Sequence, residues 1–283
     1  MSPTADFTHR AQDVLLFLDV YRGRHERPRM VELANEQFIT HEQRPELRQL
    51  AQLLLLARQQ SELQRALDAD RAQLHSGRLA HEARVTVGHH YEMMRRDACE
   101  YNHHLRGFVE ANREHVSRAD LTDWLTTASH GRRPWVEGEV TGAISEVALH
   151  AALMGLPELR QLRYGTVAED LQGFDFIASW QGRVLSVDAK TGRFHPVMAR
   201  KHDHLHLEVS VPREALDGFR LGRHGLDLLR RDIRRALHEA VGVNVHAAHA
   251  PYRPASVPVS SVVPSVISAD QTGVLIYPQP QTA

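Results

Sequence analysis

Two short apolar segments, each carrying one carboxylate, constrain the fold of this chain more than any other feature. Residues 173–178 have the sequence Gly-Phe-Asp-Phe-Ile-Ala, and residues 183–190 have the sequence Arg-Val-Leu-Ser-Val-Asp-Ala-Lys. Both segments are rich in the β-branched and aromatic residues typical of strands. The Ser-Trp-Gln-Gly sequence between them, at 179–182, is typical of a tight turn. The sequence therefore predicts a β-hairpin.

This hairpin would gather charged side chains at one place. Residues two apart in a strand share a face, so Asp188 and Lys190 are expected to point the same way. The antiparallel return of the chain would bring Asp175 beside Asp188. Two carboxylates and a lysine suit a divalent cation with a nearby water or phosphate oxygen. The alternative is an exposed hairpin whose charges only face solvent.

The arrangement resembles the PD-(D/E)xK nuclease superfamily, in which an acidic residue is followed by a hydrophobic strand and then by Asp or Glu-x-Lys. The Gly-Phe-Asp-Phe-Ile-Ala stretch is similar to the Mrr-type branch, and Val-Asp-Ala-Lys-Thr-Gly is similar to the RecB-type branch. A Gln-x-x-x-Tyr segment is not found downstream, which favours the Mrr-type branch. The resemblance covers residues 137–211 and implies an α/β fold with a restriction-endonuclease-like mixed sheet of four strands, flanked by helices.

The resemblance also implies roles for individual residues. Asp175 and Asp188 would hold Mg²⁺, which Mn²⁺ could replace, with help from the backbone carbonyl of Ala189 and from Glu146. Lys190 would orient or deprotonate the attacking water and offset charge on the phosphate. The expected catalytic residues are thus Glu146, Asp175, Asp188 and Lys190.

Glu146 enters this set through a predicted helix at residues 138–154, which is rich in Ala and Leu and is followed by Gly155 and Pro157. The spacing Gly142-x-x-x-Glu146 matches the superfamily's usual form on this helix. Glu139, seven residues earlier on the same face, is the alternative acid. A solvated glutamate without a catalytic role is the other interpretation.

The function that follows from the resemblance is a metal-dependent nuclease that hydrolyses phosphodiester bonds, with DNA as the expected substrate. The alternative function is a non-catalytic nucleic-acid-binding or scaffold protein that dimerises through a helical arm.

Three regions are expected along the chain: a helical arm and oligomerisation domain at 1–130, the nuclease-like domain at 131–250, and a Pro-rich C-terminal extension at 251–283. Two long helices, 45–74 and 79–114, are predicted to pack as a hairpin within the arm. Their high leucine content favours a homodimer formed through the arm. Residues 131–135 are predicted to be the linker between the first two regions.

Arginines supply the candidate nucleic-acid contacts. A helix predicted at 217–241 places four of them on the side opposite its apolar residues, and two more lie beside Trp135. A solvated helix face is an equally good interpretation of the first group. The candidates are Arg132, Arg133, Arg230, Arg231, Arg234 and Arg235.

Further strands are predicted at 162–167 and 205–211. The second includes part of the alternating sequence His202-x-His204-x-His206, whose imidazoles would share one strand face. A zinc site, a nucleic-acid groove and a solvated strand face are the three interpretations of this pattern. His103 is expected at the surface, and Cys99 is expected to be a packing residue.

Composition limits the remaining function classes. The net charge of −1 gives the 283-residue chain no overall basic character, so any nucleic-acid footprint must be local. A single cysteine excludes an internal disulfide and is typical of a cytoplasmic protein. No apolar run reaches the length of a membrane span, so no membrane association is expected.

Overall fold

The computed structural model describes residues 3–20, 32–75, 81–191, 196–201, 204–211, 216–243, 268–269 and 275–276. The chain divides into two compact units, Met1–Asn244 and Val245–Ala283. In the second unit, β8 (Ser268–Ala269) pairs antiparallel with β9 (Leu275–Ile276). All other described elements belong to the first unit.

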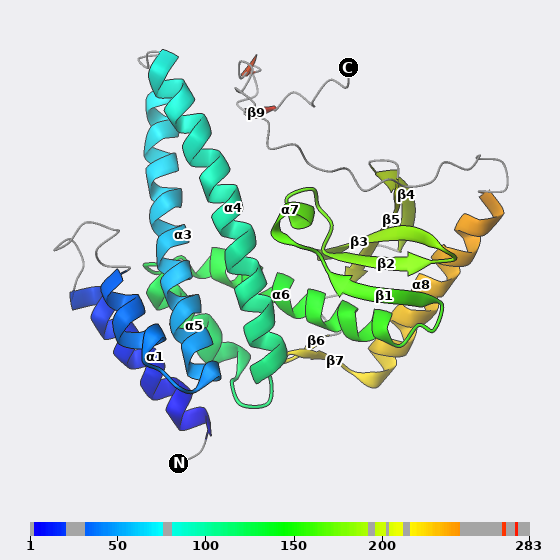
Figure 1. The fold of residues 1–283 in the computed structure, drawn as a ribbon, viewed down its shortest axis with the longest axis horizontal. Coiled ribbons are helices and arrows are strands. Elements are labelled where there is room, and N and C mark those ends of the chain that lie inside the picture. The colour runs from blue at the N-terminus through cyan, green and yellow to red at the C-terminus, as the bar shows by residue number, and fades with distance from the viewer. Residues whose placement is uncertain are drawn as a thin grey trace. The chain divides into compact units, whose positions relative to one another are not determined.

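The first unit begins with a helical region (Figure 1). Helix α3 (Pro45–His75) begins with a proline, which loses no hydrogen bond at the first position of a helix. Its leucines at positions 47, 50 and 54 are at most 1% exposed. This helix packs against the next helix, α4 (His81–Asn112), and the two form the predicted helical hairpin. The elements are α1 (Pro3–Val20), the π-helix η1 (Asn35–Thr40), α3 (Pro45–His75), α4 (His81–Asn112) and α5 (Arg118–Ala128).

The linker predicted at 131–135 is wrong from Arg133 onward, because α6 (Arg133–Met154) begins there. Pro134 is tolerated in the first turn of the helix, where its missing N–H costs nothing. Trp135 is not a free aromatic, since its ring stacks on Tyr101 of α4 with the ring centroids 5.5 Å apart. The first half of α6 packs with the helical region and the second half with the sheet, so this one helix contributes to both hydrophobic cores.

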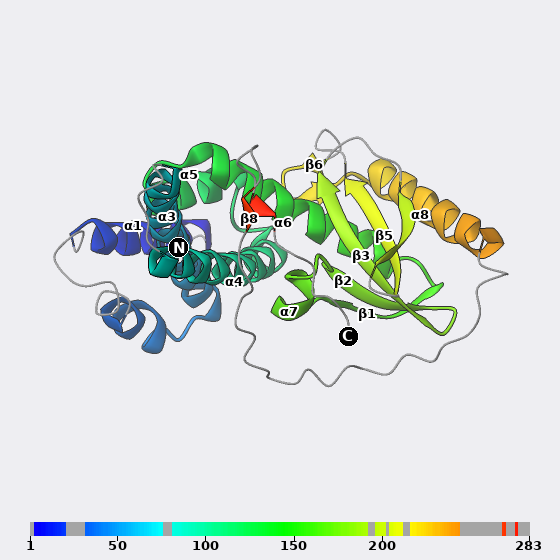
Figure 2. The same cartoon turned by 90° about the horizontal axis from the view of Figure 1, so that it is seen from above.

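A mixed five-stranded sheet follows, in the order β1-β2-β3-β5-β4 (Figure 2). Only β3 and β5 run parallel, and the other neighbours are antiparallel. A helical region followed by a mixed sheet confirms the predicted α/β class, with five strands where the resemblance implied four. The strands are β1 (Leu159–Tyr164), β2 (Phe176–Trp180), β3 (Arg183–Thr191), β4 (Val197–Lys201) and β5 (His204–Val211).

Helices α6 and α8 (Arg223–Val243) cover one face of the sheet. Val187 and Leu207 are completely buried beneath them. Alternation along the strands sends Asp188 and His206 to the opposite face. The central strands thus carry an apolar core on one side and a polar group on the other.

Two predicted boundaries were wrong. The strand expected at 162–167 lies at 159–164, where a β-bulge with Gln161 at φ 52° shifts the register. The residues after Gly165 form the short helix α7 (Val167–Asp170) instead. The helix expected from 217 begins at Arg223, because β6 (Leu216–Asp217) and β7 (Arg220–Leu221) form a small hairpin before it.

Candidate functional site

The predicted hairpin is present, and its turn explains its register. Gln181 and Gly182 have φ values of 50° and 73°, and positive φ at both central residues is the signature of a type I′ turn. The pairing continues to Asp175, whose N–H donates to the carbonyl of Val187 at 3.0 Å. The Asp175 carboxylate in turn accepts a hydrogen bond from the N–H of Ala189 at 2.6 Å. The hairpin therefore fixes Asp175 beside β3.

Asp188 and Lys190 share a face of β3, as predicted. Lys190 Nζ lies 2.5 Å from Asp188 Oδ2. The Asp188 side chain is 6% exposed, whereas that of Lys190 is 50% exposed. The ammonium group therefore lies at the solvent side of a buried carboxylate.

The neighbouring strand adds two residues to Asp188. In the parallel pairing of β3 and β5, Asp188 lies opposite Glu208, and Ser186 lies opposite His206. The ligand atoms of Asp188, His206 and Glu208 all lie within 4.8 Å of one another, so the group could hold a metal ion. Asp188 and His206 are buried and Glu208 is exposed. Among the described residues, it is this group, and not Glu146 with Asp175 and Asp188, that brings three such ligand atoms so close together.

Glu208 was missed by the sequence reasoning. Because Glu208 lies two residues after His206 in a predicted strand, both side chains share one face, and this spacing could have identified Glu208 as a candidate ligand. His202 lies outside the described residues, so the three-histidine strand face is described only in part.

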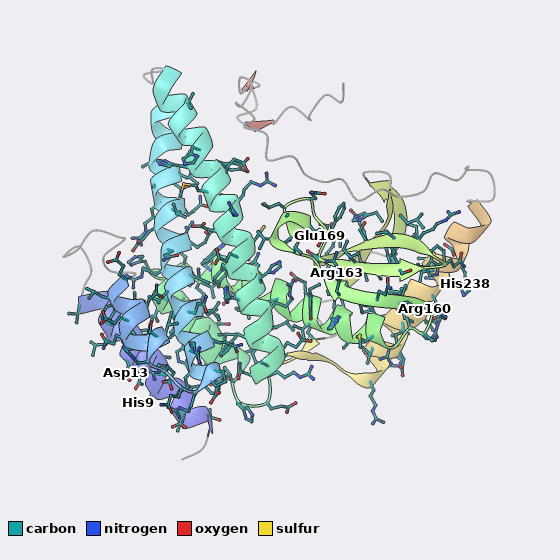
Figure 3. The ribbon with its side chains drawn as sticks, viewed as in Figure 1. His9, Asp13, Arg160, Arg163, Glu169 and His238 are labelled. Carbon is teal, nitrogen blue, oxygen red and sulfur yellow. The ribbon has the colours of Figure 1, made fainter. Side chains whose placement is uncertain are left out.

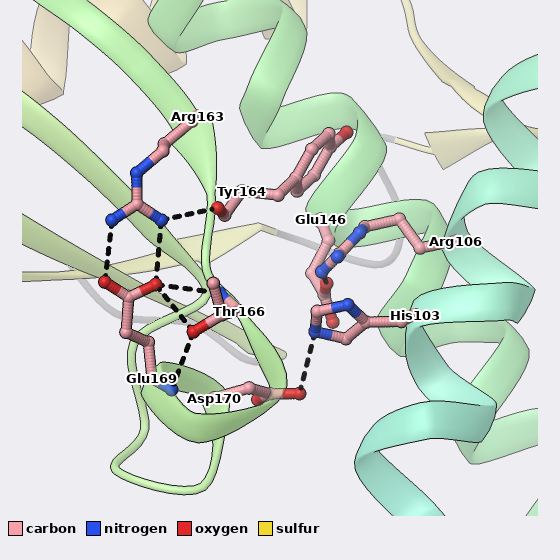
Figure 4. A network of polar contacts seen from close by, with 8 residues as sticks. All are labelled: His103, Arg106, Glu146, Arg163, Tyr164, Thr166, Glu169 and Asp170. Atoms are coloured by element: carbon pink, nitrogen blue, oxygen red, sulfur yellow. Dashed lines mark hydrogen bonds and ion pairs between the residues drawn. The ribbon is translucent and has the colours of Figure 1, made fainter. Parts of the chain in front are cut away.

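Glu146 lies on α6 as predicted, but its carboxylate is paired with an arginine. Arg106 Nη1 of α4 donates to Glu146 Oε2 at 2.7 Å, and the two side chains are 7% and 17% exposed (Figure 4). The Arg106 guanidinium also lies 4.0 Å from the ring centroid of Tyr164. Glu139, the alternative acid, is partly buried next to Asn102 and Trp135, and desolvation raises its pKa despite hydrogen bonds from both.

Helix α4 makes a second contact near Asp175. His103, which was expected at the surface, lies with Nε2 3.5 Å from Asp170 Oδ2 of α7 (Figure 4). Arg95, one turn earlier on the same side of α4 as Cys99, donates to the carbonyl of Leu171 at 3.1 Å. Burial, together with the carboxylate of Asp170, raises the pKa of the Cys99 thiol to about 12, which agrees with a packing role. The helical region thus supplies basic side chains to an acidic corner of the sheet, which is formed by Glu146, Asp170 and Asp175.

Two carboxylates of the acidic corner have raised pKa values. Burial raises the pKa of Asp175 to about 8, and the charges of Glu146, Asp188 and Asp170 add to the effect, against the hydrogen bond from Ala189. Burial also raises the pKa of Glu146, although the Arg106 charge opposes it. Burial is therefore the main cause of both shifts, and the neighbouring carboxylates add to it.

Lys190 shows the opposite balance. Burial lowers its pKa, but the hydrogen bond and charge of Asp188, with the charges of Asp175 and Glu208, outweigh burial and raise the pKa above its ordinary value. Lys190 is therefore an ammonium ion at neutral pH.

The loop before β2 is held by Glu169. Its carboxylate accepts two hydrogen bonds from Arg163, both at 2.7 Å, and completes a capping box with Thr166 (Figures 3 and 4). These hydrogen bonds lower the pKa of Glu169 to about 2. The ion pair fixes α7, which carries Asp170 and leads directly into Asp175.

Of the four α8 arginines predicted to contact nucleic acid, two are held by α6 and Glu158 and two are exposed. Arg230 donates to the carbonyls of Ala151 and Ala152 at the end of α6, and Arg234 pairs with Glu158 at 2.8 Å. The side chains of Arg231 and Arg235 are 70% and 56% exposed. In the ion pairs of the described residues, each of them pairs with Asp232 only. In the other predicted patch, Arg132 precedes the first turn of α6, and Arg133 forms ion pairs with Asp123 and Glu137.

A cavity of about 600 Å³ lies at the turn end of the hairpin. It is lined by Trp180, Gln181 and Arg234, with Arg160 and His238, which Figure 3 shows at that end of the sheet. None of Asp188, His206 and Glu208 lines it. The cavity is therefore separate from the candidate metal centre.

No protein-family model matches this chain, and no curated protein or solved structure matches it either. In the part of the chain that the structure describes, no helix combines the length and apolarity needed to cross a membrane.

Proposed function

We propose that this protein is a divalent-metal-dependent nuclease of the PD-(D/E)xK type that hydrolyses phosphodiester bonds in DNA. The observation that carries the proposal is the pairing of Lys190 with the buried Asp188 on one face of β3, beside Asp175. Acid-x-Lys on the strand that follows a first acidic residue is the arrangement that the sequence resemblance leads one to expect.

The residues present fit a divalent ion. Asp188, His206 and Glu208 offer two carboxylates and an imidazole within 4.8 Å of one another, and Asp175, whose pKa is raised by burial and by nearby carboxylates, adds a further acidic group next to Asp188. The resemblance would add Asp175, the Ala189 carbonyl and Glu146 to the ligands of Mg²⁺. A bound divalent ion would supply Lewis-acid activation of the phosphodiester.

Lys190 supplies the positive charge that phosphodiester hydrolysis requires. Its side chain is half exposed, so a phosphate oxygen can approach the ammonium group from solvent. Negative charge grows on the phosphate oxygens as water attacks phosphorus, and a fixed ammonium stabilises that charge. Because the pKa of Lys190 is raised, charge compensation suits it better than proton removal from water.

The exposed pair Arg231 and Arg235 would contact the DNA backbone, whereas Arg230 and Arg234 are already engaged within the chain. This division refines the arginine set expected from the sequence. A homodimer would place two sites on the two antiparallel strands of a duplex.

The alternative is a non-catalytic nucleic-acid-binding or scaffold protein that dimerises through the helical arm. The pairing of Glu146 with Arg106 favours it, because a carboxylate held by an arginine is a poorer metal ligand. The intact set of Asp175, Asp188 and Lys190 favours the nuclease instead.

A cleavage assay separates the two functions. Linear duplex, circular duplex and single-stranded DNA, and RNA, are incubated with the protein in Mg²⁺ or Mn²⁺. The wild type should cut at least one DNA substrate, and Lys190→Ala should slow cutting by about 100-fold or more. Lys201→Ala, which removes the only other lysine of the chain, is the matched control and should cut normally. Equal inertness of wild type and Lys190→Ala on every substrate would support the scaffold.

A further inference from the structure

We propose that Asp188, His206 and Glu208 bind a divalent first-row transition-metal ion, with Mn²⁺ as the probe, in preference to Mg²⁺. The inference deepens the proposed function and rests on it for the catalytic meaning of the ion. Binding itself depends on the ligand group alone.

The backbone builds this group at the centre of the sheet. The parallel register sets Asp188 opposite Glu208, and His206 is two residues before Glu208 on the same face. Two ligand atoms that each lie about 2.1 Å from one ion can be at most about 4.2 Å apart. The three ligand atoms lie within 4.8 Å of one another, so small side-chain movements suffice to close the site.

Ser186 selects the nitrogen that His206 offers. The Ser186 hydroxyl donates to the carbonyl of Leu205 at 3.2 Å, and its oxygen lies 2.9 Å from His206 Nδ1. If the single hydroxyl proton is donated to Leu205, the serine oxygen is left to accept from Nδ1–H. A neutral imidazole in this tautomer carries its lone pair on Nε2, the nitrogen that would then ligate a metal ion. Metal-binding histidines commonly have their other nitrogen fixed in this way.

Burial and charge suit a bound cation. Asp188 and His206 are 4% and 2% exposed, and the ring of Phe174 lies 5.9 Å from that of His206. Two carboxylates and a neutral imidazole give the group two negative charges, of which Lys190 offsets one through Asp188 Oδ2. The exposed Glu208 leaves the solvent side open, where water or a phosphate oxygen can complete the coordination.

The imidazole decides which ion the group prefers. Mg²⁺ takes oxygen ligands almost exclusively and keeps several waters. First-row transition metals accept imidazole readily, and Mn²⁺ among them also suits carboxylates. A site that requires His206 should therefore bind Mn²⁺ more tightly than Mg²⁺.

Binding of Mn²⁺ to the full-length protein, followed by the loss of the free-ion electron paramagnetic resonance signal, tests the proposal with Mg²⁺ as competitor. The wild type should bind Mn²⁺ and release little of it to equimolar Mg²⁺. His206→Gln should weaken Mn²⁺ binding by about 10-fold or more while changing Mg²⁺ binding little. Ser186→Ala should weaken Mn²⁺ binding by about 10-fold. His238→Gln, which removes an exposed histidine of α8, is the matched control and should bind as the wild type does.

Electron spin-echo spectroscopy of Mn²⁺ bound to the wild type gives a second test that does not depend on a variant's folding. It should show coupling to one imidazole nitrogen, and that coupling should disappear in His206→Gln. Bound Mn²⁺ without nitrogen coupling, or His206→Gln with wild-type affinity, would overturn the proposal. Nitrogen-coupled Mn²⁺ without cleavage would instead remove the proposed nuclease function and leave this site standing.

Discussion

Arg106 of α4 donates to Glu146 of α6 across 2.7 Å, and both side chains are largely buried. The pair joins the helical region to the helix that packs beneath the sheet. Removing one member of a buried ion pair leaves an uncompensated charge, which costs more than the pair itself contributes.

Arg106→Met should therefore destabilise the protein by about 3 kcal/mol. Arg106→Met combined with Glu146→Met should recover at least half of that loss, because neither charge is then left alone. Urea denaturation of the two variants and the wild type gives the comparison. A single variant as stable as the wild type would show that the pair is not structurally required.

Asp175 should make the metal-free protein sensitive to pH. Its folded pKa, about 8, lies above the ordinary value of 3.8, so ionisation costs stability as the pH rises from 3.8 through 8. Below that window the residue is protonated in both the folded and unfolded states and costs nothing. Asp175→Asn should thus stabilise the protein in EDTA by about 1–3 kcal/mol at pH 8.5, and by little at pH 4. Thermal denaturation at the two pH values measures this, and an equal effect at both would contradict the account.

Glu169 should have the opposite pH dependence. Its pKa is lowered from 4.5 to about 2 by Arg163 and Thr166, so its contribution is present above pH 4.5 and is lost as the pH falls through 2. Because Arg163 is half exposed, solvent screening limits the contribution to about 1 kcal/mol. Glu169→Gln should lower the free energy of unfolding by that amount at pH 7 and should approach the wild type near pH 2. A deficit that stays constant with pH would mean that the charge of Glu169 is unimportant.

Four of the five arginines of α8, those at positions 230, 231, 234 and 235, should separate into two functional pairs. The double variant Arg231→Gln, Arg235→Gln should bind DNA of every sequence more weakly. The slope of log affinity against log salt concentration should become shallower by roughly 0.9 for each lost phosphate contact. Arg230→Gln with Arg234→Gln should instead lower thermal stability, because these side chains hold the end of α6 and Glu158. Binding isotherms at several salt concentrations test both pairs. An unchanged slope in the first pair would identify a solvated helix face.

Local signals explain the parts of the fold that the sequence predicts correctly. The hairpin turn depends on Gln181 and Gly182 alone, and α5 begins where the Ser117 hydroxyl accepts from the N–H of Asp120. The linker prediction fails from Arg133 onward because α6 begins there, and Trp135 of this helix packs on Tyr101, a distant residue that no local pattern identifies.

Long-range pairing explains what the sequence could not predict about the site. Glu208 reaches Asp188 only because β5 pairs parallel with β3, and a one-residue change of register would turn it to the other face. Arg106 reaches Glu146 only because α4 packs across α6. Asp188 and Lys190, whose relation is set by strand geometry alone, were placed correctly.

Cleavage of DNA by Asp188→Asn tests the central claim most directly, because this carboxylate belongs both to the proposed metal ligands and to the ion pair with Lys190. The variant keeps the shape of the side chain and removes its charge. Wild type and variant, shown by circular dichroism to be equally folded, are compared on the same DNA in Mn²⁺ and in EDTA. The account predicts cleavage by the wild type in Mn²⁺ only, and a loss of about 100-fold or more in the variant. Cleavage by Asp188→Asn at the wild-type rate, or wild-type cleavage that persists in EDTA, would contradict it.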